Sequence, residues 1–167
     1  MNNISEPVYF EKGFAEDHRG SLEFYNDLKL DNFKRFYIVN NPKKGTVRAW
    51  HGHKIEAKLV KVLKGEFVVC TIKIDNWESP NKGIESTKFT LNENSGIVFI
   101  PPGYANGAIN LVNESSIMYF SSLTLEDSKN DDYRFDSQFW NPWIDYSPEI
   151  YCLLHTSPSP RDSCASR

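Results

Sequence analysis

The stretch Val47–Gly65 constrains the fold more than any other part of the sequence, because it combines strand-like alternation with two histidines one residue apart. In an extended strand, residues i and i+2 point to the same face, so His51 and His53 are expected to project side by side, with Arg48 nearby. From Lys58 the side chains alternate again until Gly65 ends the segment. We therefore expect two consecutive strands of a half-buried sheet that carries paired imidazoles and a lysine.

Short strand-like segments recur along the chain and are separated by turns rich in Gly, Pro, Asn and Asp. Further strands are expected at Val8–Phe10, on both sides of a turn at Asp17–Gly20, and at Lys34–Val39, Phe67–Ile72, Glu85–Leu91, Ile97–Ile100, Ala105–Val112 and Ser116–Ser122. Only Leu22–Leu30 has a spacing of apolar residues that is compatible with a helix. Many short strands at regular spacing predict an all-β sandwich or barrel in one domain.

Composition limits the function classes. The chain has 167 residues, with 19 basic and 22 acidic side chains, which does not favour a nucleic-acid or membrane-surface partner. The sequence contains no apolar run of membrane-spanning length and no signal-peptide pattern at its start. The three cysteines lack metal-site spacing. We expect a cytoplasmic protein with no nucleic-acid or membrane partner.

The composition changes abruptly at about Tyr151. The segment Cys152–Asp162 has neither a strand nor a helix period, and it resembles an in-frame translation of a sequencing-library adaptor. We therefore predict a single domain over residues 1–150 and a non-native or disordered tail over residues 151–167.

Two motifs resemble those of the cupins, whose fold is a jelly roll, or double-stranded β-helix. Gly45 precedes His51 and His53 at the spacing of the first cupin motif, and Pro101–Gly103 follows an apolar strand as in the second. The histidine usual in the second motif is replaced by Asn106, and Glu56 comes one residue too early for the usual acidic ligand. Two imidazoles and an amide make a poor transition-metal site, so we expect no metal and no organic cofactor.

A closer resemblance covers about Phe14 to Trp143. Asp17–Gly20, Val47–His51, Lys58–Glu66 and Ile100–Gly107 are similar, in this order, to motifs of the dTDP-4-dehydrorhamnose 3,5-epimerase family, a metal-independent branch of the cupins. Ala49 stands where that family has glycine, and Asn106 stands where it has histidine. The residue at the position of the family's acid tyrosine is Tyr119.

The resemblance implies epimerisation of a nucleotide-linked 4-keto-6-deoxyhexose at C3, C5 or both, in a homodimer. His51 suits the base, because imidazole titrates near neutral pH. A positive charge from Lys58 or Arg48 suits the enolate oxygen, and Tyr119 suits the acid on the opposite face. Arg19 and Arg48 suit the diphosphate. Asn41, Tyr37 and Asn106 complete the predicted substrate contacts.

Three alternatives stay open, the last of which is a metal-dependent cupin oxygenase. The segment Lys34–Ile38 followed by His51 and His53 also resembles the sugar 3,4-ketoisomerases, and so does Asp131–Arg134; in that case His51 and His53 carry the proton, with Tyr37 nearby. The second alternative belongs to a different functional class: a cupin without catalytic activity that only binds a sugar nucleotide. The aspartate that orients the family's catalytic histidine has no certain counterpart; Asp136 and Asp145 are the candidates.

Overall fold

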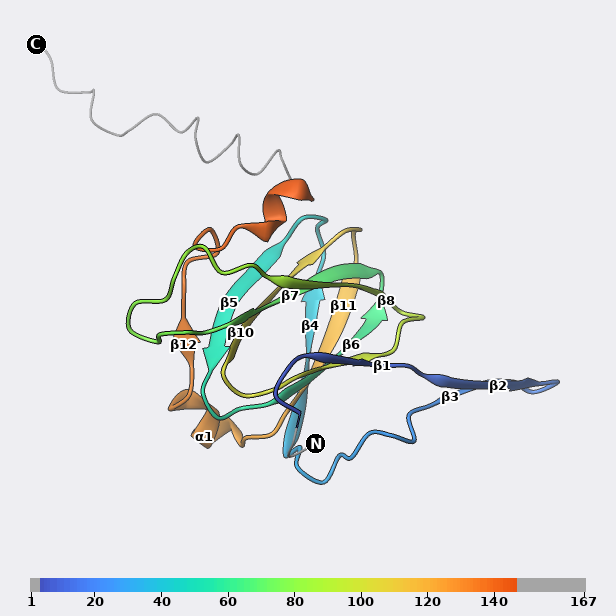
Figure 1. The fold of residues 1–167 in the computed structure, drawn as a ribbon. Coiled ribbons are helices and arrows are strands. Elements are labelled where there is room, and N and C mark those ends of the chain that lie inside the picture. Colours follow the sequence, from blue (N-terminus) through green and yellow to red (C-terminus); the bar gives the residue numbers. More distant parts are fainter. Residues whose placement is uncertain (1–3, 147–167) are drawn as a thin grey trace, which may run out of the picture.

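The computed structural model describes residues 4–146, which are built mainly from antiparallel strands (Figure 1). The strands are β1 (Val8–Phe10), β2 (Gly13–Asp17), β3 (Gly20–Phe24), β4 (Arg35–Asn41), β5 (Val47–His53), β6 (Lys58–Lys64), β7 (Glu66–Lys73), β8 (Thr87–Asn92), β9 (Ile97–Ile100), β10 (Tyr104–Asn110), β11 (Ser115–Ser121) and β12 (Tyr133–Arg134). A short helix α1 (Leu125–Lys129) and a 3-10 helix (Pro142–Asp145) follow β11 and β12. Neither of these two helices is long and apolar enough to cross a membrane.

The strands form two five-stranded sheets. One has the order β1-β9-β6-β11-β4 and the other has the order β12-β5-β10-β7-β8. From β4 to β7 and again from β8 to β11, successive strands alternate between the sheets. This topology is the predicted cupin jelly roll.

The main core lies between the sheets, because inward-facing residues alternate with outward-facing ones along each strand. Val60, Val69 and Ile117 belong to this inner cluster. The outer face of the second sheet is covered by the chain after β12, which packs Trp140 and Trp143 against Trp50. Residues from the N-terminal third of the chain cover the outer face of the first sheet, around Leu59 and Phe99.

One expectation about local structure is wrong. Leu22–Leu30 forms no helix, because its first residues pair with β2 in a hairpin and the rest is irregular apart from a turn at Asn26–Asp27. The polar segment after β11 contains α1. Thr124 caps this helix by accepting a hydrogen bond from the Asp127 backbone N–H.

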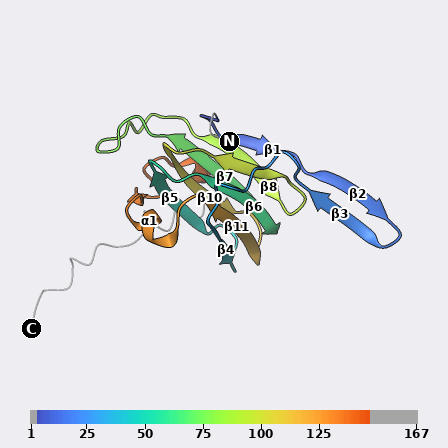
Figure 2. The same ribbon diagram turned by 90° about the horizontal axis from the view of Figure 1, so that it is seen from below.

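The β2–β3 hairpin projects away from the two sheets, as both ribbon views show (Figures 1 and 2). It pairs with neither sheet. The turn expected at Asp17–Gly20 lies at its tip, where Gly20 has a positive φ of 128°. Gly20 therefore provides a backbone conformation that other residues rarely adopt.

Candidate active site

The structure brings Tyr37, Lys58 and Tyr119 together inside the jelly roll. Tyr37 of β4 and Tyr119 of β11 face each other across neighbouring strands, and their rings stack with centroids 5.4 Å apart. Lys58, the first residue of β6, donates a hydrogen bond from Nζ to the Tyr37 hydroxyl at 3.0 Å. Only 5% of Lys58 is exposed, so it is a buried cation and not part of a solvated sheet face.

Tyr119 is held in its protonated form. Burial raises the pKa of its phenol far above the usual value, Tyr37 raises it further, and the positive charge of Arg48 opposes the rise. A phenol that keeps its proton at neutral pH is suited to act as a proton donor. The environment of Tyr119 is therefore compatible with its predicted role as the acid.

His51 lies on β5 and is partly buried. Its pKa is lowered to about 4, mainly by burial and then by the charges of Arg134 and Lys58, while Asp132 opposes them. Arg134 Nη1 lies 3.4 Å from His51 Nε2; since a guanidinium only donates, this ring nitrogen is the acceptor. His51 is therefore a neutral imidazole at physiological pH.

His53 follows on the same strand and is 4% exposed. Its Nδ1 lies 2.7 Å from the Asp131 carbonyl oxygen and 3.2 Å from Glu56 Oε2. A carbonyl only accepts hydrogen bonds, so Nδ1 carries the proton and Nε2 of the neutral ring is left with a free lone pair. Nε2 is buried and has no hydrogen-bond partner among residues 4–146.

Glu56 lies in the connection between β5 and β6 and is 1% exposed. Its Oε1 is 3.4 Å from Lys58 Nζ and 3.5 Å from Arg35 Nη2, and its Oε2 accepts a hydrogen bond from Ser128 Oγ at 2.9 Å. Burial raises its pKa, but Lys58 and the hydrogen bonds outweigh that effect, so the net pKa is lowered. Glu56 is therefore a buried carboxylate that keeps its charge.

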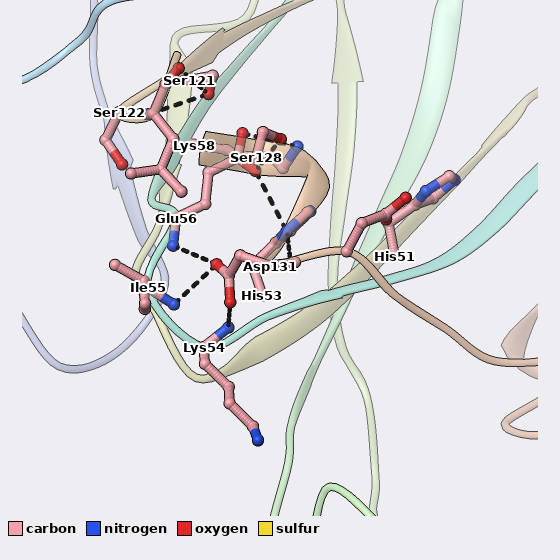
Figure 3. Close-up of polar contacts among 12 residues, drawn as sticks. His51, His53, Lys54, Ile55, Glu56, Lys58, Ser121, Ser122, Ser128 and Asp131 are labelled. Atoms are coloured by element: carbon pink, nitrogen blue, oxygen red, sulfur yellow. Dashed lines mark hydrogen bonds and ion pairs between the residues drawn. The ribbon is translucent and has the colours of Figure 1, made fainter. Parts of the chain in front are cut away.

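Asp131 fixes the loop that carries Glu56. Its carboxylate accepts hydrogen bonds from the backbone N–H groups of Lys54, Ile55 and Glu56 at 2.8–2.9 Å (Figure 3). Its carbonyl oxygen also accepts a hydrogen bond from His53 Nδ1–H. One residue from the segment after α1 thus connects the β5–β6 loop with the ring of His53.

An irregularity in β5 places Arg48 on the same face of the strand as His51. The register between β10 and β5 shifts between the pairs Asn106–His51 and Ala108–Arg48, as at a β-bulge. Arg48 donates from Nε to the Oδ1 atom of buried Asn41 at 2.9 Å. Asn41 therefore orients a guanidinium near Tyr119.

Of the remaining predicted substrate contacts, Asn106 lies beside the histidines, whereas Arg19 lies far from them. Asn106 is buried on β10 and donates from Nδ2 to the His51 carbonyl oxygen at 3.0 Å, so it fixes the backbone of β5. Arg19 lies at the tip of the hairpin, where it pairs with Asp17. Within one chain, Arg19 is therefore remote from the histidines.

Neither aspartate suggested as the orienting partner of His51 contacts its ring. Asp136 accepts a hydrogen bond from the Gln138 backbone, and Asp145 pairs with Lys88. The carboxylate that acts on His51 is Asp132, which is itself paired with Arg134 at 2.7 Å.

Sequence reasoning missed three members of this network. Glu56 was considered only as a metal ligand, and Asp131 and Arg134 only as part of a resemblance. Asp131 acts largely through backbone groups, which leave no trace in a sequence pattern. Within residues 4–146, no three His, Cys, Asp or Glu side chains converge so that they could hold a metal ion.

Comparison with known proteins gives one family match. A family model described as dTDP-4-dehydrorhamnose 3,5-epimerase matches residues 2–166 of the chain. A search of curated proteins found no match.

Several solved structures share the fold. A dTDP-4-dehydrorhamnose 3,5-epimerase from Bacillus anthracis, with TDP and PPi bound, is 21% identical over 84% of this chain and 86% of its own, with a TM-score of 0.68. An epimerase from Legionella pneumophila in complex with dTDP-4-keto-L-rhamnose is 21% identical over 84% of this chain and 80% of its own, with a TM-score of 0.65. A sugar 3,4-ketoisomerase from Thermoanaerobacterium thermosaccharolyticum in complex with TDP is 18% identical over 85% of this chain and 97% of its own, with a TM-score of 0.62.

Proposed function

The chain belongs to the dTDP-4-dehydrorhamnose 3,5-epimerase family, and from this premise we propose that it epimerises a dTDP-linked 4-keto-6-deoxyhexose at C3, C5 or both. Membership identifies it as an isomerase, as the sequence motifs predicted. We place the reaction in the biosynthesis of dTDP-rhamnose-type sugars. We also propose a cytoplasmic location.

The observation that carries the proposal is the buried Lys58 ammonium beside two phenols and two neutral imidazoles. A proton on the carbon next to a ketone becomes acidic when the enolate oxygen meets a preorganised positive charge. Lys58 provides that charge where little water competes with it. The site therefore combines a base, a cation and an acid without a cofactor.

The proton transfers follow from these roles. His51 takes the proton from C3 or C5, and the electrons of the broken C–H bond move toward the C4 oxygen, where Lys58 stabilises the enolate. Tyr119 returns a proton to the opposite face, and the configuration inverts. Arg134 must leave His51 Nε2 before that atom accepts a proton; its side chain is 61% exposed and has room to move.

We propose that Arg48 binds the diphosphate, oriented by Asn41. Tyr37 is expected to contact the sugar and Asn106 to shape the strand beside it.

We further propose a homodimer. Strand β4 is the free edge of its sheet and exposes Phe36 and Ile38, while the projecting hairpin exposes Phe14 and Leu22. Pairing of two copies would cover these side chains. In such a dimer the hairpin, which extends away from its own site (Figures 1 and 2), would bring Arg19 to the site of the second copy.

The second candidate function is 3,4-ketoisomerisation. It is favoured by His53, whose Nε2 lone pair has no partner among the described residues, whereas His51 Nε2 already accepts from Arg134. In that reaction the histidine pair would move a proton between C3 and C4, so that the carbonyl ends at C3.

Solvent exchange tests the proposal. The full chain is incubated with dTDP-4-keto-6-deoxyglucose in deuterated water, and the sugar protons are followed by NMR. Deuterium at C3 or C5 with inverted configuration is the expected result, and His51→Ala should reduce the rate roughly 100- to 10,000-fold. A carbonyl at C3 would establish the ketoisomerase, and binding without exchange would identify a non-catalytic cupin.

A further inference from the structure

The Glu56 carboxylate is buried, and burial is energetically unfavourable for a charged group. A carboxylate inside a protein loses the hydration of its charge, and removing it in favour of well-packed apolar atoms is often neutral or stabilising. Glu56 nevertheless keeps its charge at 1% exposure, surrounded by Lys58, Arg35, His53 and Ser128. A purely structural reason for it is therefore weak.

The two oxygens of this carboxylate face different groups. Oε2 lies 3.2 Å from His53 Nδ1, and Oε1 lies 3.4 Å from Lys58 Nζ, which in turn donates to the Tyr37 hydroxyl. The connection Lys54–Ala57 between β5 and β6 is short, so Glu56 reaches a side chain from each strand. The loop itself is fixed by Asp131 (Figure 3).

We propose that Glu56 is a positioning residue that orients Lys58 for stabilising the enolate of the epimerisation proposed above, and His53 for the proton transfer of the second candidate reaction. The inference rests on that proposed function. Glu56 does not touch the substrate; it acts on one side chain that handles protons and on one that stabilises the enolate. No sequence motif assigned it this role.

On the His53 side, Glu56 and the Asp131 carbonyl hold the Nδ1 proton, so that Nε2 presents its lone pair to the interior. When Nε2 takes a proton, whether from a sugar carbon or from His51, the ring becomes an imidazolium and the nearby carboxylate stabilises its positive charge. The same proton leaves Nε2 again, for C4 of the sugar in the ketoisomerisation or back to His51. Glu56 stays ionised throughout and exchanges no proton.

On the Lys58 side, Oε1 restrains the ammonium against Tyr37. Arg35 also lies near Oε1, so two cations share one carboxylate and the group keeps a net positive charge. This net positive charge can stabilise the negative charge that develops on the enolate oxygen.

Five charged or titratable groups act on His53 or adjoin it: Lys58, Glu56, Asp131, Asp132 and His51. Burial lowers the pKa of His53 and Lys58 lowers it further, whereas Glu56 and Asp131 raise it. Neutralising Glu56 would therefore move the titration of His53 to lower pH. A role confined to packing, with no electrostatic contact between Glu56 and the His53 ring, would leave that titration unchanged.

The test is Glu56→Gln, which keeps the shape and removes the charge, with Glu56→Asp as the conservative variant. Glu126→Gln, on the exposed side of α1, is the matched control. We expect kcat to fall about 100-fold in Glu56→Gln because misplacement of a reacting group by about 1 Å has that effect. KM should stay unchanged, Glu56→Asp should recover part of kcat, and Glu126→Gln should match the wild type.

A second measurement does not depend on turnover. The His53 ring of the resting protein is titrated by nitrogen-15 NMR, and we expect a lower midpoint in Glu56→Gln than in the wild type. If Glu56→Gln does not fold, the same comparison is made with Glu56→Asp, whose shorter side chain moves the charge away from Nδ1 and should also lower the midpoint.

Wild-type kcat together with an unshifted midpoint in Glu56→Gln would overturn the inference. If the wild-type protein exchanges no deuterium and forms no product, the proposed function fails. The titration then still decides whether Glu56 controls His53.

Discussion

His51 occupies surroundings that favour the neutral imidazole. Its pKa is lowered to about 4, first by burial and then by Arg134 and Lys58. A base must be unprotonated to act, so kcat/KM should stay level from neutral pH down to about 5 and decline near pH 4. The check is a pH profile of kcat/KM at constant ionic strength.

Arg134→Gln serves as the companion variant for this profile. Removing a positive charge that lowers the His51 pKa should shift the decline to higher pH. A wild-type profile that declines near the ordinary histidine value of about 6.5 would contradict the described environment of His51.

In the proposed mechanism Tyr119 and His51 act in separate steps, and one substitution should separate them. Tyr119→Phe removes the proposed acid but leaves the base and Lys58 in place. We expect deuterium to continue to enter the substrate at C3 or C5, while the inverted product falls at least 10-fold below the wild type. NMR of the same sample measures both quantities, and inversion at the wild-type rate would exclude Tyr119 as the acid.

His51 and His53 could be identified as site residues from the sequence, because few packing arrangements need two histidines on one strand face. The side chains that contact them could not be identified in this way. Lys58 in a run of lysines equally suggests a solvated face, and its burial follows only from the position of β6 between β9 and β11. The Glu56 contacts require three segments to meet, which no local pattern encodes.

At the scale of elements, Asp131 joins the β5–β6 loop to the chain after α1. Asp131→Ala would leave three backbone N–H groups without their acceptor, and each buried unsatisfied donor costs about 1–3 kcal/mol. Because Lys54 and Ile55 are exposed enough for water to replace part of this loss, we expect a decrease of about 3 kcal/mol in the free energy of unfolding.

Urea denaturation measures this decrease, and an unchanged slope m shows that the two-state comparison is valid. Asp31→Ala, at an exposed position, is the control and should stay within about 0.5 kcal/mol of the wild type. A loss for Asp131→Ala no larger than that of the control would mean that the loop is held by other contacts.

The strands were largely predictable, because alternation and turn residues mark them locally. Ile97–Ile100 coincides with β9, and the ends of β7, β8, β10 and β11 differ from the expectation by a few residues at most. The bulge between β5 and β10 was not predictable. It brings Arg48 and His51 to one site although they are three residues apart, and it depends on pairing with a distant strand.

At the scale of the molecule, each terminal part of the described chain covers the outer face of one sheet. The edge strand β4 and the β2–β3 hairpin keep their apolar side chains exposed. These are the surfaces on which the proposed homodimer depends. The predicted boundary at residue 150 and the tail lie outside the described residues and stay predictions.

Mixing two inactive variants tests whether Arg19 serves the site of a second copy. In a mixed dimer of Arg19→Ala and His51→Ala chains, the Arg19→Ala subunit keeps His51 and would receive Arg19 from its partner, so one of the two sites is complete. Random reassembly makes about half of all dimers mixed, and activity should therefore return to roughly a quarter of the wild-type value. If Arg19 acted within its own chain, every site would lack one residue, and the mixture would stay as inactive as its components.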